Sequence, residues 1–182
     1  MGRPKLLLPI GGKPVVRHAA ERLLDAGIGP LVVVLGHEEG QVRTALASLP
    51  VDFVVNPDPA AGQASSLVAG IRALPPATAA VLVALGDQPF VPAHVIQGLI
   101  YAFRSAGTPI AAPRYRDGLG NPVVFGAEVF AELEALAGDR GARAVIERDP
   151  SRVTLVDFEQ SMPQDVDTPA DYDRLRASEG PV

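Results

Sequence analysis

The sequence of 182 residues contains no cysteine, which excludes disulfide bonds, thiol catalysis and cysteine-ligated zinc or iron–sulfur sites. It also lacks an excess of basic residues. The net charge is −5 at pH 7, whereas nucleic-acid and anionic-membrane surfaces favour basic patches. No apolar stretch approaches the roughly 18 residues that span a bilayer, and glycines follow the short run Leu6–Leu8, unlike in a signal peptide. We therefore expect a cytoplasmic protein that binds neither nucleic acid nor membrane.

Several catalytic signatures are missing as well. There is no G-x-S-x-G motif and no complete Walker loop, so hydrolase and P-loop interpretations lack support. The three histidines, His18, His37 and His94, are scattered without the spacing of metal ligands. We assign them no catalytic role.

The residues that are present predict one globular domain over 1–182, since 47% are hydrophobic and 20% are charged. Apolar runs alternate with helical patterns, which predicts an α/β fold with a three-layer, doubly wound sheet. We expect strands at 31–35, 51–55, 81–85, 109–112, 122–125 and 153–158. We expect helices at 14–27, 38–49, 62–74, 92–106 and 127–136, a short one ending near 148 and one from 169, after a loop at 1–13.

The start of the chain departs from this fold class. Doubly wound nucleotide-binding folds usually open with a central strand that leads into a phosphate-binding turn. Here the sequence starts where that turn would finish, at Met1-Gly2.

An acidic residue follows the most apolar strand. The run at 81–85 has no alternation, which is typical of a strand buried on both faces in a parallel sheet. Gly86 and Asp87 come directly after it, at the strand end where open α/β sheets bind ligands. Asp87 is thus a candidate ligand for a metal or substrate. The alternative is that it caps the helix that starts near Pro92.

A second acidic cluster lies near the end of the chain. In Asp165-Val166-Asp167, an extended backbone places both carboxylates on one side. Carboxylates that converge without histidine or cysteine suit a hard cation such as Mg²⁺. The alternative is a helix cap and a solvated charge, next to the expected cap at Thr168.

Three further segments have residues suited to anions. Lys5 lies near a glycine-containing loop and is a candidate phosphate ligand, or else a solvated lysine. The segment 62–66 offers backbone N–H groups and two hydroxyls at a helix start, or else ordinary capping. Arg140 and Arg143 are candidates for an anionic substrate, or else for surface ion pairs.

Together, seven segments in this order resemble the molybdenum-cofactor nucleotidyltransferases, and the cytidylyltransferase branch in particular. The resemblance covers nearly the whole chain. The segments are GRPKLLLP, LVVVLGH, VVNPDPAAGQASSL, ALGDQP, GNPVVF, GDRGAR and DVDTP.

The resemblance implies a Rossmann-like fold of the nucleotide-diphospho-sugar transferase type and a Mg²⁺-dependent transfer of CMP from CTP to the phosphate of molybdenum-bound molybdopterin, with release of pyrophosphate. It implies that Lys5 and Asp87 are catalytic and that Asp87, Asp167 and Asp165 hold the metal. The nucleotide-binding residues would be Gly2, Arg3, Lys5, Asn56, Gly62, Ser65 and Ser66, and the acceptor-binding residues Asn121, Asp139 and Arg143. A molybdenum hydroxylase is an expected partner.

Two departures from the family are visible. The family begins with a strand and a loop like LAAGxSxRMG, so we expect the chain to be truncated and its true start to lie upstream of Met1. Asn121 stands where the family often has histidine in a GHP motif. One alternative is transfer of a guanylyl group, with GTP in place of CTP, or of another nucleotidyl group, to molybdopterin or to another phosphorylated acceptor. The other is a catalytically weak chaperone of the same fold that binds the cofactor.

Overall fold

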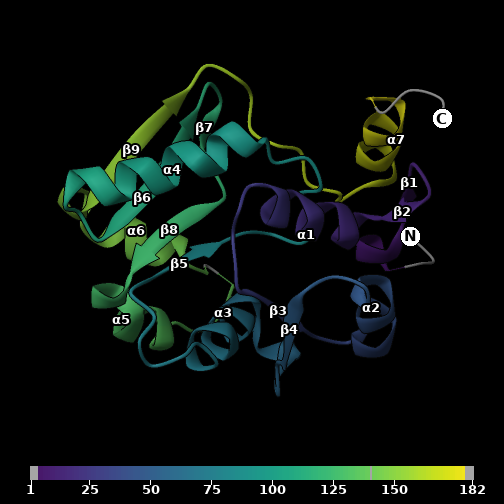
Figure 1. The fold of residues 1–182 in the computed structure, drawn as a ribbon, viewed down its shortest axis with the longest axis horizontal. Helices are drawn as coiled ribbons and strands as arrows, with labels where there is room; N and C mark the ends of the chain where they lie inside the picture. Colours follow the sequence, from purple (N-terminus) through teal and green to yellow (C-terminus); the bar gives the residue numbers. More distant parts are fainter. Residues whose placement is uncertain (1–3, 140, 179–182) are drawn as a thin grey trace.

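In the computed structural model, which describes residues 4–139 and 141–178, strands and helices alternate along the chain (Figure 1). The largest sheet has five strands, in the order β5-β8-β6-β7, with β9 on the other edge of β6. β9 is parallel to β6, and all other pairs in this sheet are antiparallel. The strands are β5 (Ala80–Val83), β6 (Ile110–Tyr115), β7 (Gly118–Leu119), β8 (Val123–Gly126) and β9 (Val153–Phe158).

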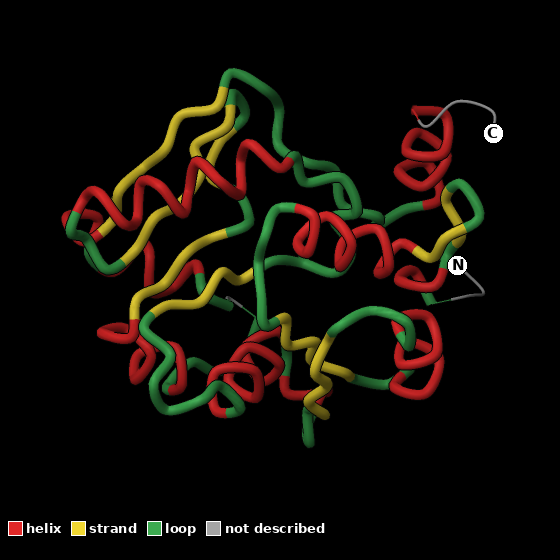
Figure 2. The backbone as a smooth tube through the Cα atoms, viewed as in Figure 1, coloured by secondary structure: helices red, strands yellow, loops and turns green. Residues whose placement is uncertain are grey.

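Two smaller sheets complete the strands. β3 (Leu31–Leu35) and β4 (Val51–Val55) are parallel and pair along their whole length. β1 (Pro9–Ile10) and β2 (Lys13–Pro14) form a short antiparallel hairpin. In the described residues β3 is hydrogen-bonded as a strand only to β4, and β5 only to β8, so each has one unpaired edge. Figure 2 shows these groups of strands apart from one another.

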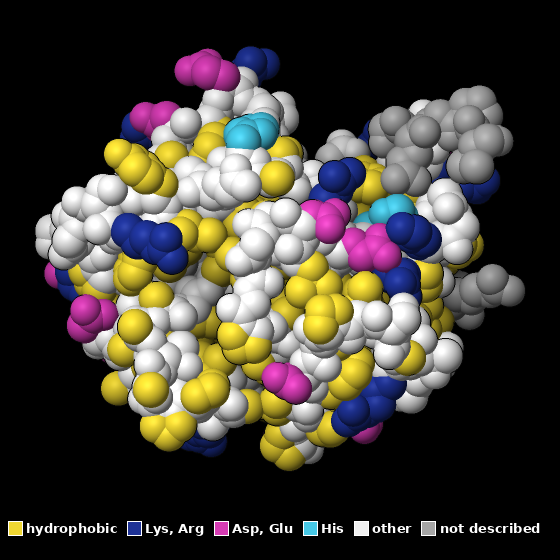
Figure 3. All heavy atoms as spheres, viewed as in Figure 1, with side chains coloured by type: hydrophobic (Ala, Val, Ile, Leu, Met, Phe, Trp, Pro, Cys, Tyr) yellow, Lys and Arg dark blue, Asp and Glu magenta, His cyan; other side chains and the backbone are white. Residues whose placement is uncertain are grey.

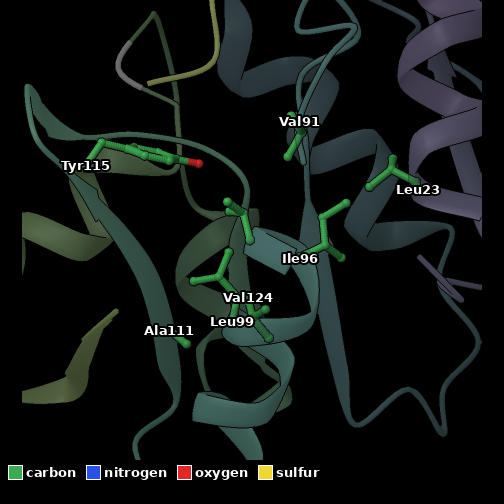
Figure 4. Packing of buried hydrophobic residues seen from close by; sticks show 8 residues of the cluster. Leu23, Val91, Ile96, Leu99, Ala111, Tyr115 and Val124 are labelled. Carbon is green, nitrogen blue, oxygen red and sulfur yellow. The ribbon is translucent and has the colours of Figure 1, made fainter. Parts of the chain in front are cut away.

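Helices cover both faces of the large sheet. Successive strand residues face opposite sides: Ala111 and Val124 pack with α4, whereas Ile110 and Phe125 pack with α3 and α5. Figure 4 shows the first of these two clusters. This arrangement confirms the predicted three-layer mixed α/β fold. The helices are α1 (Val15–Asp25), α2 (Glu39–Leu46), α3 (Gln63–Arg72), α4 (Ala93–Ala106), α5 (Phe130–Glu134), α6 (Arg143–Arg148) and α7 (Pro169–Ser178).

Several predicted boundaries are confirmed and others are wrong. The strands at 31–35, 51–55 and 153–158 are as predicted. The expected strand at 81–85 is β5, which ends at Val83, is only half-buried and pairs with an antiparallel neighbour. β6 continues to Tyr115 because β9 pairs with it over six residues.

Other expected elements are shorter than predicted or divided. The helix expected at 38–49 is α2, which ends at Leu46. The helix expected at 127–136 consists of the 3₁₀ turn η3 (Ala127–Val129) and α5. The segment expected to be a loop at 1–13 contains the turn η1 (Lys5–Leu7), β1 and the first residue of β2.

The surface mixes charges of both signs. Over the part of Figure 3 where α1 and the β1–β2 hairpin lie, acidic and basic side chains are neighbours. Glu21 there accepts hydrogen bonds from Lys13 and Arg17, both at 2.8 Å. None of the described helices is both long enough and apolar enough to cross a bilayer.

Candidate active site

One ammonium group joins the two acidic segments. Lys5 Nζ donates to Asp87 Oδ2 at 2.5 Å and to Asp167 Oδ1 at 2.7 Å. The three residues are separated by 82 and 162 positions in the sequence, so only the fold brings them together. The side chain of Asp87 is 17% exposed and that of Asp167 is 61% exposed. The cluster therefore runs from the protein interior to solvent.

Backbone contacts hold the two acidic segments against each other. Asp87 follows β5 in a turn that the Gln88 N–H closes by donating to the Leu85 carbonyl at 3.3 Å. The Val166 N–H donates to the Asp87 carbonyl at 3.1 Å. Val166 is fully buried with Ile10 and Val15, while Asp165 and Asp167 on either side of it are at least partly exposed. The predicted alternation of this segment is thus confirmed.

The opening segment is packed in the same way. Leu6 and Leu7 of η1 pack against a core cluster made by α1, β3 and α2. Leu6 also lies close to Gly86, since a Cβ placed on Gly86 would be 3.6 Å from Leu6 Cδ2. These contacts place Lys5 beside the turn that carries Asp87.

The structure decides among the alternative roles for these residues. Asp87 does not cap the next helix, because α4 has Pro92 at its N-cap and no side-chain cap. Thr168 caps α7, where the Asp171 N–H donates to Thr168 Oγ1 and the Thr168 N–H donates to Asp171 Oδ2. Lys5 is paired with two carboxylates rather than solvated alone.

Burial and neighbouring charges shift two pKa values in the cluster. Burial alone would lower the pKa of Lys5, but hydrogen bonds to Asp167 and Asp87 outweigh burial and hold this pKa above its ordinary value. Burial raises the pKa of Asp165, and the neighbouring charges of Asp87 and Asp167 raise it further. The Gln88 amide and Lys5 oppose that rise.

The donor set fits a hard divalent cation in part. Asp87 and Asp167 offer carboxylate oxygens, which Mg²⁺ and Mn²⁺ prefer, and Mg²⁺ is often held by only one or two carboxylates. The Lys5 ammonium is the cation between them here. Asp165 instead accepts from Gln88. No group of three His, Cys, Asp or Glu in the described part of the chain is arranged to hold a metal ion.

A buried glutamine is the site residue that the sequence analysis missed. Gln88 is 2% exposed, and its Nε2 donates to Asp165 Oδ1 at 2.6 Å. It stands inside the segment ALGDQP, but a glutamine beside a proline carries no signal of its own.

The predicted nucleoside residues form a second polar cluster. Asn56 is buried at the end of β4, and its Nδ2 donates to Ser65 Oγ at 2.8 Å and Ser66 Oγ at 3.0 Å. The Ser65 hydroxyl donates to the Gly62 carbonyl. The structure thus brings Asn56, Gly62, Ser65 and Ser66 together, largely through contacts among themselves. Gly2 and Arg3 lie outside the described residues.

The predicted acceptor residues are spread over three places. Asp139 lies against Gly62, where an added Cβ would be 2.4 Å from Asp139 Oδ1. Arg143 forms an ion pair with Glu147 on the exposed face of α6 at 2.8 Å. The Asn121 carbonyl accepts from the Tyr115 hydroxyl at 2.8 Å. Arg140 lies outside the described residues.

A shallow hollow adjoins the lysine segment. It has a volume of about 700 Å³ and lies between η1 and α2. Leu7 lines it, two residues after Lys5, together with His37 and Gln41. No local pattern in the sequence predicts this hollow.

Comparisons with known proteins show the family of the chain. The family model described as "MobA-like NTP transferase domain" matches residues 1–153. A protein named nicotine blue oxidoreductase, from Paenarthrobacter nicotinovorans, is 36% identical over 96% of this chain and 89% of its own length.

Two solved structures are similar in both sequence and fold. Rv0371C from Mycobacterium tuberculosis H37Rv, in a complex with manganese, is 32% identical, with a TM-score of 0.84 over 97% of this chain and 93% of that one. A nucleotidyl transferase from Methanothermobacter thermautotroptrophicus is 28% identical, with a TM-score of 0.80 over 96% of this chain and 84% of that one.

Proposed function

This chain belongs to the MobA-like NTP transferase family, and from that premise we propose that it transfers CMP from CTP to the phosphate of molybdopterin. The family and the relatives make it a nucleotidyltransferase. The choice of CTP and of molybdopterin is our proposal, supported by the resemblance of the seven sequence segments to the cytidylyltransferase branch.

One observation carries the proposal: Lys5 lies between Asp87 and Asp167. In the proposed reaction an oxygen of the acceptor phosphate forms a bond to the α-phosphorus of CTP. The bond from that phosphorus to the bridging oxygen breaks, and pyrophosphate leaves with the electron pair. Such a transfer needs positioning and charge stabilisation more than a covalent side chain. The acceptor phosphate is already ionised, so no histidine base is needed.

Each residue of the cluster has a role in this reaction. Lys5 binds the triphosphate and offsets the negative charge that develops on it. Asp87 and Asp167 would hold a divalent cation, for which we propose Mg²⁺. When bound, that cation would neutralise charge on the phosphate oxygens. We place the nucleoside at Asn56, Gly62, Ser65 and Ser66, and the acceptor at Asn121, Asp139 and Arg143.

Two observations favour alternative functions that the experiment must distinguish from cytidylyl transfer. Nothing in the polar contacts of Asn56 selects cytosine, so GTP is the alternative nucleotide. The name of the Paenarthrobacter relative denotes an oxidation–reduction activity, so a redox enzyme on this fold is the second candidate. A catalytically weak cofactor-binding chaperone is a third. For the transferase we further propose a cytoplasmic location and a molybdenum hydroxylase as the recipient of the product.

The test combines binding and turnover. Calorimetry with Mg²⁺ compares CTP with GTP, and pyrophosphate release is followed with each nucleotide and the molybdenum cofactor. We expect preferential binding of CTP, pyrophosphate release, and no release by Asp87→Asn. Arg114→Gln, at an exposed ion pair with Asp157, is the control and retains activity.

Other outcomes reject parts of the proposal. A preference for GTP would mean that the enzyme transfers GMP and not CMP. Cofactor binding without pyrophosphate release supports the chaperone. Electron transfer to an organic substrate without pyrophosphate release supports the redox enzyme. Unchanged turnover in Asp87→Asn removes the role given to Asp87.

A further inference from the structure

Gln88 is an unusual residue for its position. It is one of only two buried polar or charged residues in the described part of the chain, the other being Asn56. Its Nε2 donates to Asp165 Oδ1 at 2.6 Å and to the Pro163 carbonyl at 3.4 Å. Its Oε1 is buried and has no hydrogen-bond partner among the described residues. A buried acceptor without a partner is energetically unfavourable.

The orientation of the amide is fixed by Asp165. If the amide were turned over, Oε1 would face Asp165 Oδ1 at the 2.6 Å now spanned by a hydrogen bond, and two acceptors would repel. A leucine of similar size would remove the unpaired acceptor, but it would also leave Asp165 Oδ1 and the Pro163 carbonyl without this donor. The amide thus holds Asp165 at the cost of an unpaired Oε1, and a buried group that breaks a packing rule points to function.

We propose that Gln88 is a positioning residue. Its amide fixes the Asp165 carboxylate as a negative charge beside Asp87 and Asp167, the pair of carboxylates proposed to hold the cation. This inference rests on the proposed function, since it assumes that the pair holds a divalent cation. Asp165 lies close enough to Asp87, Asp167 and Lys5 for their charges to affect its pKa. The Val166 N–H to Asp87 carbonyl bond fixes the backbone of this segment, and Gln88 fixes its side chain.

Residues that orient a metal site without binding the metal themselves affect metal affinity measurably. Changing a group that orients a metal site typically lowers affinity by about 10-fold to 100-fold. We therefore expect Gln88→Leu to weaken Mn²⁺ binding by roughly 10-fold. The same substitution removes the unpaired Oε1 and also the hydrogen bonds to Asp165 and Pro163, so the melting temperature reports on folding alone and Mn²⁺ affinity decides the role. A merely structural glutamine would leave the Mn²⁺ affinity of the folded variant unchanged.

The experiment titrates the nucleotide-free protein with Mn²⁺, followed by electron paramagnetic resonance, for wild type, Gln88→Leu, Asp165→Asn and the double variant. If Gln88 acts through Asp165, the double variant binds Mn²⁺ as weakly as Asp165→Asn alone. Asp87→Asn is included to report on the pair itself.

Each result has a definite meaning. Wild-type Mn²⁺ affinity in Gln88→Leu, or additive losses in the double variant, overturns the inference about Gln88. If Asp87→Asn also binds Mn²⁺ as wild type does, the cation site of the proposed function fails as well. Loss in Asp87→Asn with no loss in Gln88→Leu leaves the proposed function standing and rejects this inference alone.

Discussion

At the scale of single residues, Lys5 has two opposing effects in the proposed site: it competes with a divalent cation for carboxylates, and it stabilises charge on the phosphates. Its ammonium forms hydrogen bonds to the same carboxylates, Asp87 and Asp167, that would hold the cation. If these carboxylates hold the cation as proposed, the lysine and the cation would compete for the same oxygens in the absence of nucleotide. In the proposed reaction, the lysine would turn to the phosphates once nucleotide is bound, and its charge would aid transfer.

Substitution of Lys5 by methionine is therefore expected to have effects of opposite sign. Mn²⁺ should bind more tightly to the nucleotide-free variant, because no ammonium competes for Asp87 and Asp167. Turnover should fall by about 10²-fold to 10³-fold, as for loss of one charge-stabilising group. Metal titration and pyrophosphate release measure the two effects.

Lys13→Met is the matched control. Lys13 is similarly exposed and also paired with a carboxylate, Glu21, but that pair is outside the candidate site. Neither Mn²⁺ affinity nor turnover should change. An unchanged Mn²⁺ affinity in Lys5→Met would show that the cation does not share the position of the ammonium.

The sequence predicted some site residues and not others for a physical reason. Asp87 and the pair Asp165 and Asp167 are charged residues at strand and helix ends, where charge is informative. Gln88 is uncharged, and its importance comes from burial and from one contact 77 positions away. Neither property can be derived from the local sequence pattern.

At the scale of elements, the start of α3 contacts the loop before α6. Gly62 has φ 94° and ψ −179°, a conformation open essentially to glycine alone. The Ala64 N–H donates to the Gly138 carbonyl at 3.0 Å. A Cβ on Gly62 would be 2.8 Å from the backbone of Gly138. This close approach joins the proposed nucleoside and acceptor segments.

Gly62→Ala is expected to destabilise the fold more than an alanine at another glycine of positive φ. Gly107, at the end of α4, has φ 70° and no atom within 4 Å of an added Cβ. Gly107→Ala should therefore cost only the backbone strain, about 1–2 kcal/mol. Gly62→Ala should cost roughly 1–3 kcal/mol more, because the added Cβ forces the loop away. Urea denaturation measures both values, and equal costs would contradict the close packing seen here.

The elements themselves were predictable where one local pattern decided them. The runs at 31–35 and 153–158 are apolar or β-branched and end at clear breaks, and both were predicted correctly. The apolar run at 81–85 predicts a strand of a parallel sheet. The strand at this position, β5, pairs with the antiparallel strand β8, and the last residue of β5 in this pairing is Val83. A strand's partner depends on distant sequence, so its direction and its last residue were not visible locally.

At the scale of the whole molecule, burial differs between the strands in a way that follows their pairing. All four residues of β8, which has neighbours on both sides, are buried. All four residues of β5 are only half-buried, and so are four of the five in β3. These are apolar residues, so their partial exposure reflects the unpaired edges rather than their composition.

This difference predicts a pattern of hydrogen exchange. Amide hydrogens exchange slowly where they are hydrogen-bonded in well-packed structure, and faster where local opening is easy. β3 and β5 each have amides on an edge without a strand partner. β6 pairs with β9 along its whole length, and its other edge pairs with β8 at 110–111 and with β7 at 114–115. We expect the amides of 31–35 and 80–83 to exchange faster than those of 110–112 and 123–125. Exchange measured by mass spectrometry on the native protein compares these segments in one sample, so β6 and β8 are the internal control. Equal protection in all four strands would mean that the edges of β3 and β5 are covered in solution, and the arrangement of the sheets described above would then have to be revised.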